Sequence, residues 1–173
     1  MSRLKGEIAQ QKPFASIEEE AVLNLMRTSD AIERAFHLST RQWGVTSTQY
    51  NVLRILRGAH PQGLTCAAIG ARMITAEPDI TRLLRRLKAL RLIRQSRDTR
   101  DRRVVWTRIS TAGLELLRAM DPVIEKLPKE LLGHMSQAEL DQFIRLLERA
   151  RNRDETEPRL RCEGNAEEEN RKL

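Results

Sequence analysis

The apolar residues between positions 76 and 109 change their spacing within a few residues, and this change constrains the fold more than any other feature. Up to residue 90 they recur every three or four positions, which is the period of a helix with one buried face. Residues 92–97 and 104–109 then read as two short strands with a period of two. The segment that joins them is mostly charged, so it must face solvent or a polyanion. We therefore expect a helix followed by a β-hairpin with an exposed tip.

Three other helix starts are marked by capping boxes, in which a Ser or Thr side chain and a Glu or Gln side chain satisfy exposed amide groups. The boxes are Ser16 with Glu19, Thr46 with Gln49, and Ser136 with Glu139. Apolar residues at helical spacing follow each box, so we expect helices from residue 16 to about 43, from 46 to about 58, and from 136 to about 151. The last helix is expected to bury four apolar side chains: Leu140, Phe143, Ile144 and Leu147.

Two helices are expected between the second box and the hairpin. Thr65 is the expected N-cap of a short helix that ends near Met73. A longer helix should cover about residues 76–90, with Pro78 in its first turn, because the amide that proline lacks would be unpaired there. Its buried side should hold Ile80, Leu83, Leu84, Leu87 and Leu90, and its opposite side Asp79, Arg82, Arg85, Arg86 and Ala89.

Positive charge is concentrated in the same part of the chain. The formal net charge is +7, and the stretch from Arg72 to Arg108 holds twelve Lys or Arg residues against four Asp or Glu. That stretch has a surplus of eight positive charges, so the rest of the chain has a net charge of −1. Such a local surplus is what a polyanion partner requires, with solvated helix faces as the alternative explanation.

The order of elements, with a basic helix followed by a charged hairpin, is that of a winged helix-turn-helix protein, in which the second helix of the pair enters the major groove of DNA. The expected fold class is therefore mainly α with a small β-hairpin wing. Thr65, at a helix start, is expected to bind a backbone phosphate. The expected DNA-contacting residues of the basic helix are Pro78, Asp79, Thr81, Arg82 and Arg86, with Asp79 accepting a hydrogen bond from cytosine.

The tip of the hairpin carries guanidinium groups on a narrow projection, which suits the minor groove of DNA. Arg102 and Arg103 are the expected contacts there. We expect Asp101 to orient one of them by ion pairing, and Asp98 to close the turn through a side-chain hydrogen bond to the backbone.

Four motifs resemble the MarR family of bacterial regulators: Ile80-Thr81-Arg82-Leu83, Leu92-Ile93-Arg94, Asp98-x-x-Asp101-Arg102-Arg103 and Ile109-Ser110-x-x-Gly113. The resemblance extends over about residues 17–150. It implies a homodimer joined by its terminal helices that binds a pseudo-palindromic operator in double-stranded DNA. It also implies a repressor that a small molecule releases. Two alternatives stay open, because the fold does not fix function: an architectural protein that binds DNA without sequence preference, or a protein-interaction module.

The domain limits follow from these patterns. We expect an N-terminal arm over residues 1–15, a DNA-binding and dimerisation domain over 16–151 with its DNA-binding lobe at about 46–110, and a disordered charged tail over 152–173. Two residues depart from the family pattern: Arg91 stands where a glycine is usual after the basic helix, and Thr99 stands where proline is common in the wing.

Other residues that could carry chemistry do not form a catalytic or metal-binding pattern, so we expect no enzyme activity, no metal and no cofactor. Cys66 is expected to be a small core residue, with a thiol sensor as the alternative. Phe36 and Trp43 are expected to pack in the core, with a ligand pocket as the alternative. No apolar run approaches the roughly 18 residues of a membrane span, which favours a cytoplasmic protein without a membrane partner.

Overall fold

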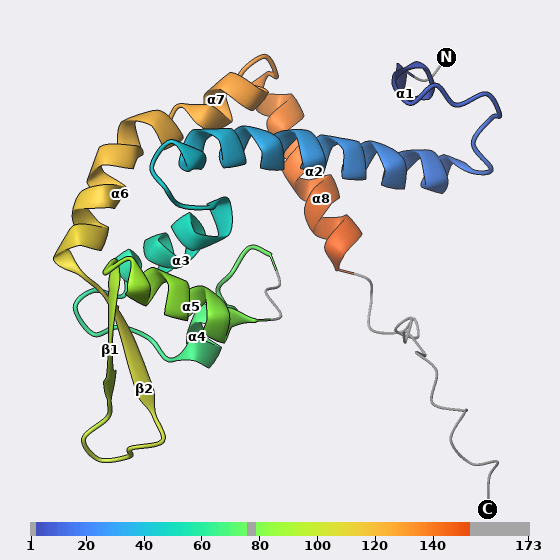
Figure 1. Ribbon diagram of the computed structural model, residues 1–173. Coiled ribbons are helices and arrows are strands. Elements are labelled where there is room, and N and C mark those ends of the chain that lie inside the picture. Colours follow the sequence, from blue (N-terminus) through green and yellow to red (C-terminus); the bar gives the residue numbers. More distant parts are fainter. Residues whose placement is uncertain (1–2, 76–78, 153–173) are drawn as a thin grey trace, which may run out of the picture. The chain divides into compact units, whose positions relative to one another are not determined.

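The computed structural model describes residues 3–75 and 79–152, and within them the protein is mainly helical with one two-stranded sheet (Figure 1). The described chain forms two compact units, one that ends at Leu132 and one that begins at Gly133. None of the described helices is long and apolar enough to cross a membrane. The elements are α1 (Arg3–Glu7), α2 (Ile17–Arg41), α3 (Ser47–Gly58), α4 (Cys66–Gly70), α5 (Ile80–Ala89), β1 (Ile93–Arg97), β2 (Val105–Ile109), α6 (Thr111–Ile124), α7 (Leu127–Leu132) and α8 (Gln137–Arg151).

The helix starts follow the capping chemistry with one exception. Both capping boxes at Thr46 and Ser136 are formed as predicted. At the start of α2, the Ser16 side chain accepts from the Glu19 amide at 3.1 Å, but the Glu19 carboxylate accepts from the amide of Ala15 instead of Ser16. The segment expected to be an N-terminal arm contains the short helix α1, which the apolar pattern did not indicate.

Helix α5 begins later than predicted. Asp79 has φ −124° and ψ 63°, outside the helical region, and its carboxylate accepts from the backbone amide of Arg82 at 2.8 Å. Asp79 is therefore the N-cap of α5, and the helix starts at Ile80 because this side chain satisfies one of its unpaired amides. Pro78, expected in the first turn, lies outside the described residues.

Helix α5 ends in a Schellman motif, in which two backbone amides after the helix bond back to its last turn. The Leu92 amide donates to the Leu87 carbonyl at 3.1 Å, and the Arg91 amide donates to the Lys88 carbonyl at 2.9 Å. Arg91 has φ +59°, the left-handed conformation that favours glycine. The residue that stands in place of the family's usual glycine is thus an arginine in a strained backbone conformation.

The wing, residues 93–109, is an antiparallel hairpin whose register pairs Ile93 with Ile109 and Arg97 with Val105. A short stretch before α4 extends this sheet, because Leu64 and Thr107 exchange backbone hydrogen bonds of 2.9 and 2.8 Å. Gly63, with φ +82°, permits this approach, since a Cβ there would lie 2.5 Å from the Thr107 carbonyl oxygen. The base of the wing is therefore fixed to the helical part of the same unit.

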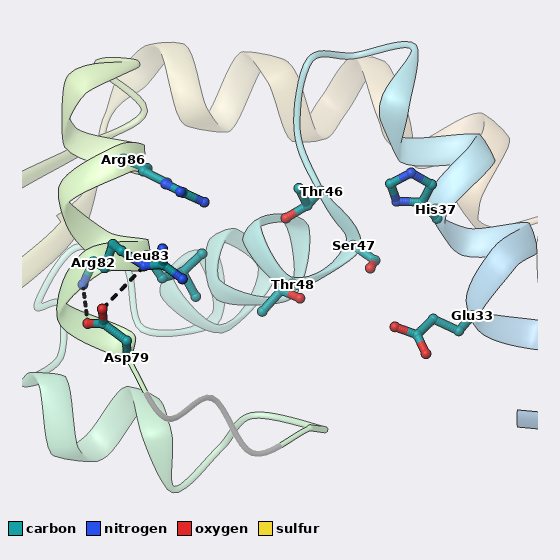
Figure 2. A pocket seen from close by; sticks show the side chains of 9 residues that line it. All are labelled: Glu33, His37, Thr46, Ser47, Thr48, Asp79, Arg82, Leu83 and Arg86. Carbon is teal, nitrogen blue, oxygen red and sulfur yellow. Dashed lines mark hydrogen bonds and ion pairs between the residues drawn. The ribbon is translucent and has the colours of Figure 1, made fainter. Parts of the chain in front are cut away.

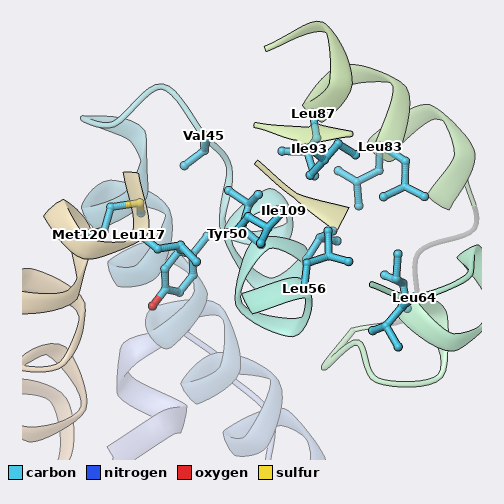
Figure 3. Close-up of a cluster of buried hydrophobic side chains, with 14 of the residues drawn as sticks. Val45, Tyr50, Leu56, Leu64, Leu83, Leu87, Ile93, Ile109, Leu117 and Met120 are labelled. Atoms are coloured by element: carbon cyan, nitrogen blue, oxygen red, sulfur yellow. The ribbon is translucent and has the colours of Figure 1, made fainter. Parts of the chain in front are cut away.

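A single apolar cluster joins α3, α4, α5, the base of the wing and α6 (Figure 3). On α5, Leu83, Leu84 and Leu87 are buried as predicted, and Ile80 is half-buried. The prediction that Leu90 is buried is wrong: the side chain is 49% exposed, because Leu90 is the C-cap where the chain leaves the helix. The cluster contains Val45, Tyr50, Val52, Leu53, Leu56, Leu64, Ile69, Leu83, Leu84, Leu87, Ile93, Ile109, Leu117, Met120 and Ile124.

Side-chain hydrogen bonds connect helix α6 to the end of α5 and to α3. Ser110 caps it, accepting from the Gly113 amide at 3.1 Å while donating to the Arg91 carbonyl at 2.7 Å. Nη1 of Arg57 on α3 donates to both carboxylate oxygens of Asp121 on α6, at 2.7 and 3.0 Å. Pro122 lies in the last turn of α6, which ends at Ile124, and the next helix begins at Leu127.

Helix α8, in the second unit, does not bury the four side chains that periodicity assigned to it. None of its fifteen residues, all of which are described, is fully buried, and Ile144 is 52% exposed. The prediction that these four side chains are buried is therefore wrong. The repeat shows that one face of the helix is apolar, but it does not say what covers that face.

Candidate DNA-binding surface

The outer face of α5 is polar, basic and exposed. Thr81, Arg82, Arg85 and Arg86 are all exposed, whereas the leucines on the opposite side enter the core. This division follows from the helical period of 3.6 residues, which places positions 82, 85, 86 and 89 on one side. Three of the side chains predicted to contact DNA, Thr81, Arg82 and Arg86, are thus accessible on one short helix.

Asp79 caps α5 and contacts Arg82, and its predicted hydrogen bond from cytosine stays a prediction. Its Oδ2 lies 3.2 Å from Nε of Arg82, and its Oδ1 accepts from the backbone of the same residue. The carboxylate therefore caps the helix and holds the stem of Arg82. Because Arg82 is 60% exposed, its outer guanidinium nitrogens still reach solvent.

A polar pocket of about 280 Å³ lies between this face of α5, the N-terminus of α3 and one side of α2. Figure 2 shows Arg82 and Arg86 on one side of the hollow and Glu33 and His37 of α2 across from them. Amide groups at a helix N-terminus favour anions, as do the two arginines. The residues that line the pocket are Glu33, His37, Thr46, Ser47, Thr48, Asp79, Arg82, Leu83 and Arg86.

The turn of the wing is organised by Asp98, as predicted. Its Oδ1 accepts from the backbone amides of Arg100 and Asp101 at 2.8 and 3.0 Å, and its Oδ2 accepts from Nε1 of Trp106 at 2.9 Å. These three bonds stabilise the ionised form, so the Asp101 amide, Trp106 and the Arg100 amide hold the pKa of Asp98 below its ordinary value. The charged turn is therefore a defined structure and not a loose loop.

Asp101 does not orient an arginine by ion pairing. Its Oδ1 accepts from the backbone amide of Arg103 at 2.9 Å, and no salt bridge joins it to Arg102 or Arg103, both of which are described. A carboxylate two residues before an amide reaches that amide more easily than a guanidinium, which explains the difference. Arg102 and Arg103 are exposed at the tip.

Four further arginines of the wing were missed: Arg94, Arg97, Arg100 and Arg108. Arg94, Arg97 and Arg100 are exposed, and Arg108 is half-buried. The strand pattern already contained the signal, because both predicted strands are basic at polar positions. That signal applies to Arg94, Arg97 and Arg108, whereas Arg100 lies in the turn, where the prediction named only Arg102 and Arg103.

Thr65 and Cys66 lie at the start of α4. Thr65 is the N-cap of α4, and its hydroxyl accepts from the Ala68 amide at 3.2 Å, so its contact with phosphate stays a prediction. The expectation that Cys66 lies in the core is wrong, because the residue is exposed at the first position of α4. The helix has only five residues, too few for the apolar period to identify its buried side.

The remaining candidate residues belong to the core or form no site. Phe36 and Trp43 are partly buried against the apolar cluster, as expected, and other residues line the pocket of Figure 2. Nε1 of Trp43 is buried and finds no hydrogen-bond partner among the described residues. Within residues 3–75 and 79–152, no group of His, Cys, Asp or Glu side chains could hold a metal ion.

Comparison with known proteins identifies the arrangement. The MarR family profile matches residues 43–104, which run from the start of the helix-turn-helix to the turn of the wing. No curated protein matches the chain at a significant level.

Three solved structures are similar over most of the chain. A MarR transcription factor from Planctomyces limnophilus shares 38% identity, with a TM-score of 0.62, over 79% of this chain and 98% of its own. A point mutant of MarR from E. coli, complexed with operator DNA, shares 19% identity, with a TM-score of 0.67, over 86% of this chain and 99% of its own. PcaV from Streptomyces coelicolor, in complex with its natural ligand, shares 24% identity, with a TM-score of 0.66, over 81% of this chain and 97% of its own.

The first of these structures is similar enough in sequence, and over enough of both chains, to establish common membership. The mainly helical fold with a hairpin wing agrees with it, as do the basic α5 and the charged wing tip. The chain therefore belongs to the MarR family, whose members are DNA-binding transcription regulators and not enzymes.

Proposed function

We propose that the protein is a sequence-specific repressor that binds a pseudo-palindromic operator as a homodimer and is released by a small molecule. The observation that carries the proposal is the pairing of an exposed basic helix with an ordered, arginine-tipped wing on the same compact unit. A regulator of this kind acts in the cytoplasm of a bacterial cell, because the operator DNA lies there.

The proposed contacts divide into base reading and backbone binding. Arg82, Thr81 and Arg86 on the exposed face of α5 would reach base edges and phosphates of the major groove. Arg102 and Arg103 at the wing tip would enter the adjacent minor groove, where narrow segments concentrate negative potential. Asp79 contributes by orienting Arg82, and Thr65 and Pro78 remain proposed contacts.

Exposed apolar side chains support the homodimer. On α2, Ile17 is 78% exposed and Leu38 is 67% exposed, and on α8 Ile144 and Leu146 are about half exposed. Solvated helices that carry this much apolar surface are usually covered in the functional assembly. A second copy would cover them and would place two α5 helices about 34 Å apart, one turn of DNA, to match a pseudo-palindrome.

The pocket beside α5 is the proposed effector site. Its two arginines and the N-terminus of α3 suit an anionic group, and Glu33 across the pocket suits a hydroxyl donor, so we propose a small hydroxy acid. Because Arg82 and Arg86 also belong to the proposed DNA contacts, ligand and operator would compete for them. A ligand that binds only the DNA-free state lowers DNA affinity by mass action.

Quantitative binding of the full chain to DNA upstream of its gene, and to a scrambled fragment of equal length, tests the proposal at physiological salt. We expect clear preference for the upstream fragment. Arg82→Ala should reduce the discrimination by about 1–3 kcal/mol, whereas Arg103→Ala should weaken binding to both fragments and lower the salt slope by about one. Equal binding to both fragments by the unaltered protein would instead indicate an architectural protein.

The effector site is tested separately through Glu33, which lies on α2 and outside the proposed DNA contacts. Glu33→Gln should keep operator affinity but change the response to a panel of small phenolic acids. An unchanged response of the variant to an acid that releases the unaltered protein would exclude this pocket.

A further inference from the structure

The outer face of the wing carries two arginines directly opposite each other. The register pairs Arg94 of β1 with Arg108 of β2, and the next pair on the same face is Ser96 with Trp106. Side chains on the inner face, Ile93, Thr107 and Ile109, are buried at 2%, 1% and 5% exposure. Arg94 and Arg108 therefore lie side by side on the face that the core does not use.

This pair is unfavourable in the isolated protein. Like charges directly opposite each other destabilise an antiparallel sheet, since their Cβ atoms lie only about 5 Å apart. Within the described part of the chain, neither guanidinium forms a salt bridge that would offset the repulsion. The arrangement is thus one that an external anion would stabilise.

Arg108 is held in position for such an anion. Its Nη1 donates to Oγ of Ser96 on the neighbouring strand at 2.8 Å, which holds the guanidinium across the hairpin. Its stem passes close to Gly63, because a Cβ built on that glycine would lie 2.5 Å from Cγ of Arg108. One donor is engaged by the serine, and the remaining donors of the planar group are available to a ligand.

We propose that the outer face of the wing, Arg94 with Arg108, is a second DNA-binding element that grips the phosphate backbone beside the groove that the wing tip enters. The inference rests on the proposed function. The minor groove is only about 6 Å wide and has a phosphate strand on each side, so a hairpin inserted at its tip presents its faces to phosphates. Two adjacent positive charges, of which Ser96 holds the one on Arg108, complement that phosphate strand and carry no base specificity.

Charge reversal at Arg94 gives a test with two readouts of opposite sign. Arg94→Glu places an acid opposite Arg108, so the melting temperature of the protein should rise. Its DNA affinity should fall on operator and scrambled fragments alike. If Arg94 had only a structural role, the substitution would lower both the melting temperature and the DNA affinity, or neither. An Arg94→Glu protein with unchanged DNA affinity would overturn the proposal.

Neutral variants measure the number of phosphates contacted. The logarithm of the DNA association constant falls as the logarithm of salt concentration rises. Arg94→Gln and Arg108→Gln should each make this negative slope shallower by about 0.9. The ratio of wild-type to variant affinity should therefore shrink about 3.5-fold per contact when salt rises from about 50 to 200 mM. Lys126→Gln, an exposed charge before α7, is the matched control and should leave the slope unchanged.

The outcomes separate this inference from the proposed function. If the unaltered protein shows no preference for its upstream DNA, the proposed function fails. If that preference is present but both arginine variants keep the salt slope of the unaltered protein, only the inference about the wing face fails.

Discussion

Replacing Arg91 by glycine should stabilise the protein, although it removes a charged side chain and adds no contact. Arg91 has φ +59° directly after α5, and the conformation is imposed from both sides. The amides of Arg91 and Leu92 bond back to the helix, and the Ser110 hydroxyl donates to the Arg91 carbonyl at 2.7 Å. The backbone cannot relax without losing these bonds, so a side chain at this position is held in strain.

The size of the effect follows from two opposing terms. The left-handed conformation costs a residue with a Cβ about 1–2 kcal/mol, and glycine removes that cost. Glycine also gives the unfolded chain more freedom, which takes back about 0.4–1 kcal/mol. Arg91→Gly should therefore raise the free energy of unfolding by about 0.5–1 kcal/mol, or the melting temperature by roughly 1–4 °C for a domain of this size.

Thermal and urea unfolding followed by circular dichroism would measure the change, at equal protein concentration because dimerisation couples to stability. Arg91→Ala is the matched control, since it removes the same exposed side chain but keeps a Cβ in the left-handed conformation. We expect it to be no more stable than the unaltered protein. A glycine variant no more stable than the alanine variant would refute the argument from backbone strain.

Three further predictions follow from the same geometry. Gly113→Ala should lower the free energy of unfolding by about 1–3 kcal/mol in urea unfolding, because its Cβ would lie 2.3 Å from the Leu92 carbonyl oxygen. The pKa of Asp98 is lowered, so its stabilisation of the wing turn is complete above pH 3.8, the ordinary pKa, and is lost as the pH falls through the lowered pKa. Trp106 fluorescence should report this transition, and Asp98→Asn should remove it. Ile144→Glu should shift the protein from dimer to monomer in light scattering.

Local chemistry made much of the fold predictable. Thr46 and Ser136 were identified as helix starts because a capping box is a short-range pattern that operates wherever the chain begins a helix. The hairpin and the role of Asp98 followed from the change of period and from an aspartate at the start of a charged turn. Arg91 was recognised as an unusual cap because glycine is the residue that this position favours.

The errors share a physical cause, which is that periodicity describes a helix but not its ends or its partners. Leu90 continues the leucine repeat but is the C-cap, directly before Arg91, where the backbone turns away from the helix. The capping role of Asp79 was not foreseen, because it depends on where α5 starts. Ile144 is on the apolar face of α8, but the sequence does not say whether its own chain or a second copy covers that face.

The opposed pair on the wing was overlooked for a related reason. Arg94 and Arg108 are fourteen positions apart, and only the register places them opposite each other. The pairing is symmetric about Asp101, so the position of the turn determines which side chains meet. The sequence contains both arginines, but the repulsion between them is visible only once the strands are paired.

Selection of binding sites from a pool of random double-stranded DNA by the full-length protein tests sequence-specific recognition by a dimer most directly. Binding by two α5 helices about one turn of DNA apart predicts enrichment of an inverted repeat with half-site centres about 10 base pairs apart. Retention of DNA without any enriched motif, or enrichment of a single unrepeated motif, would contradict it.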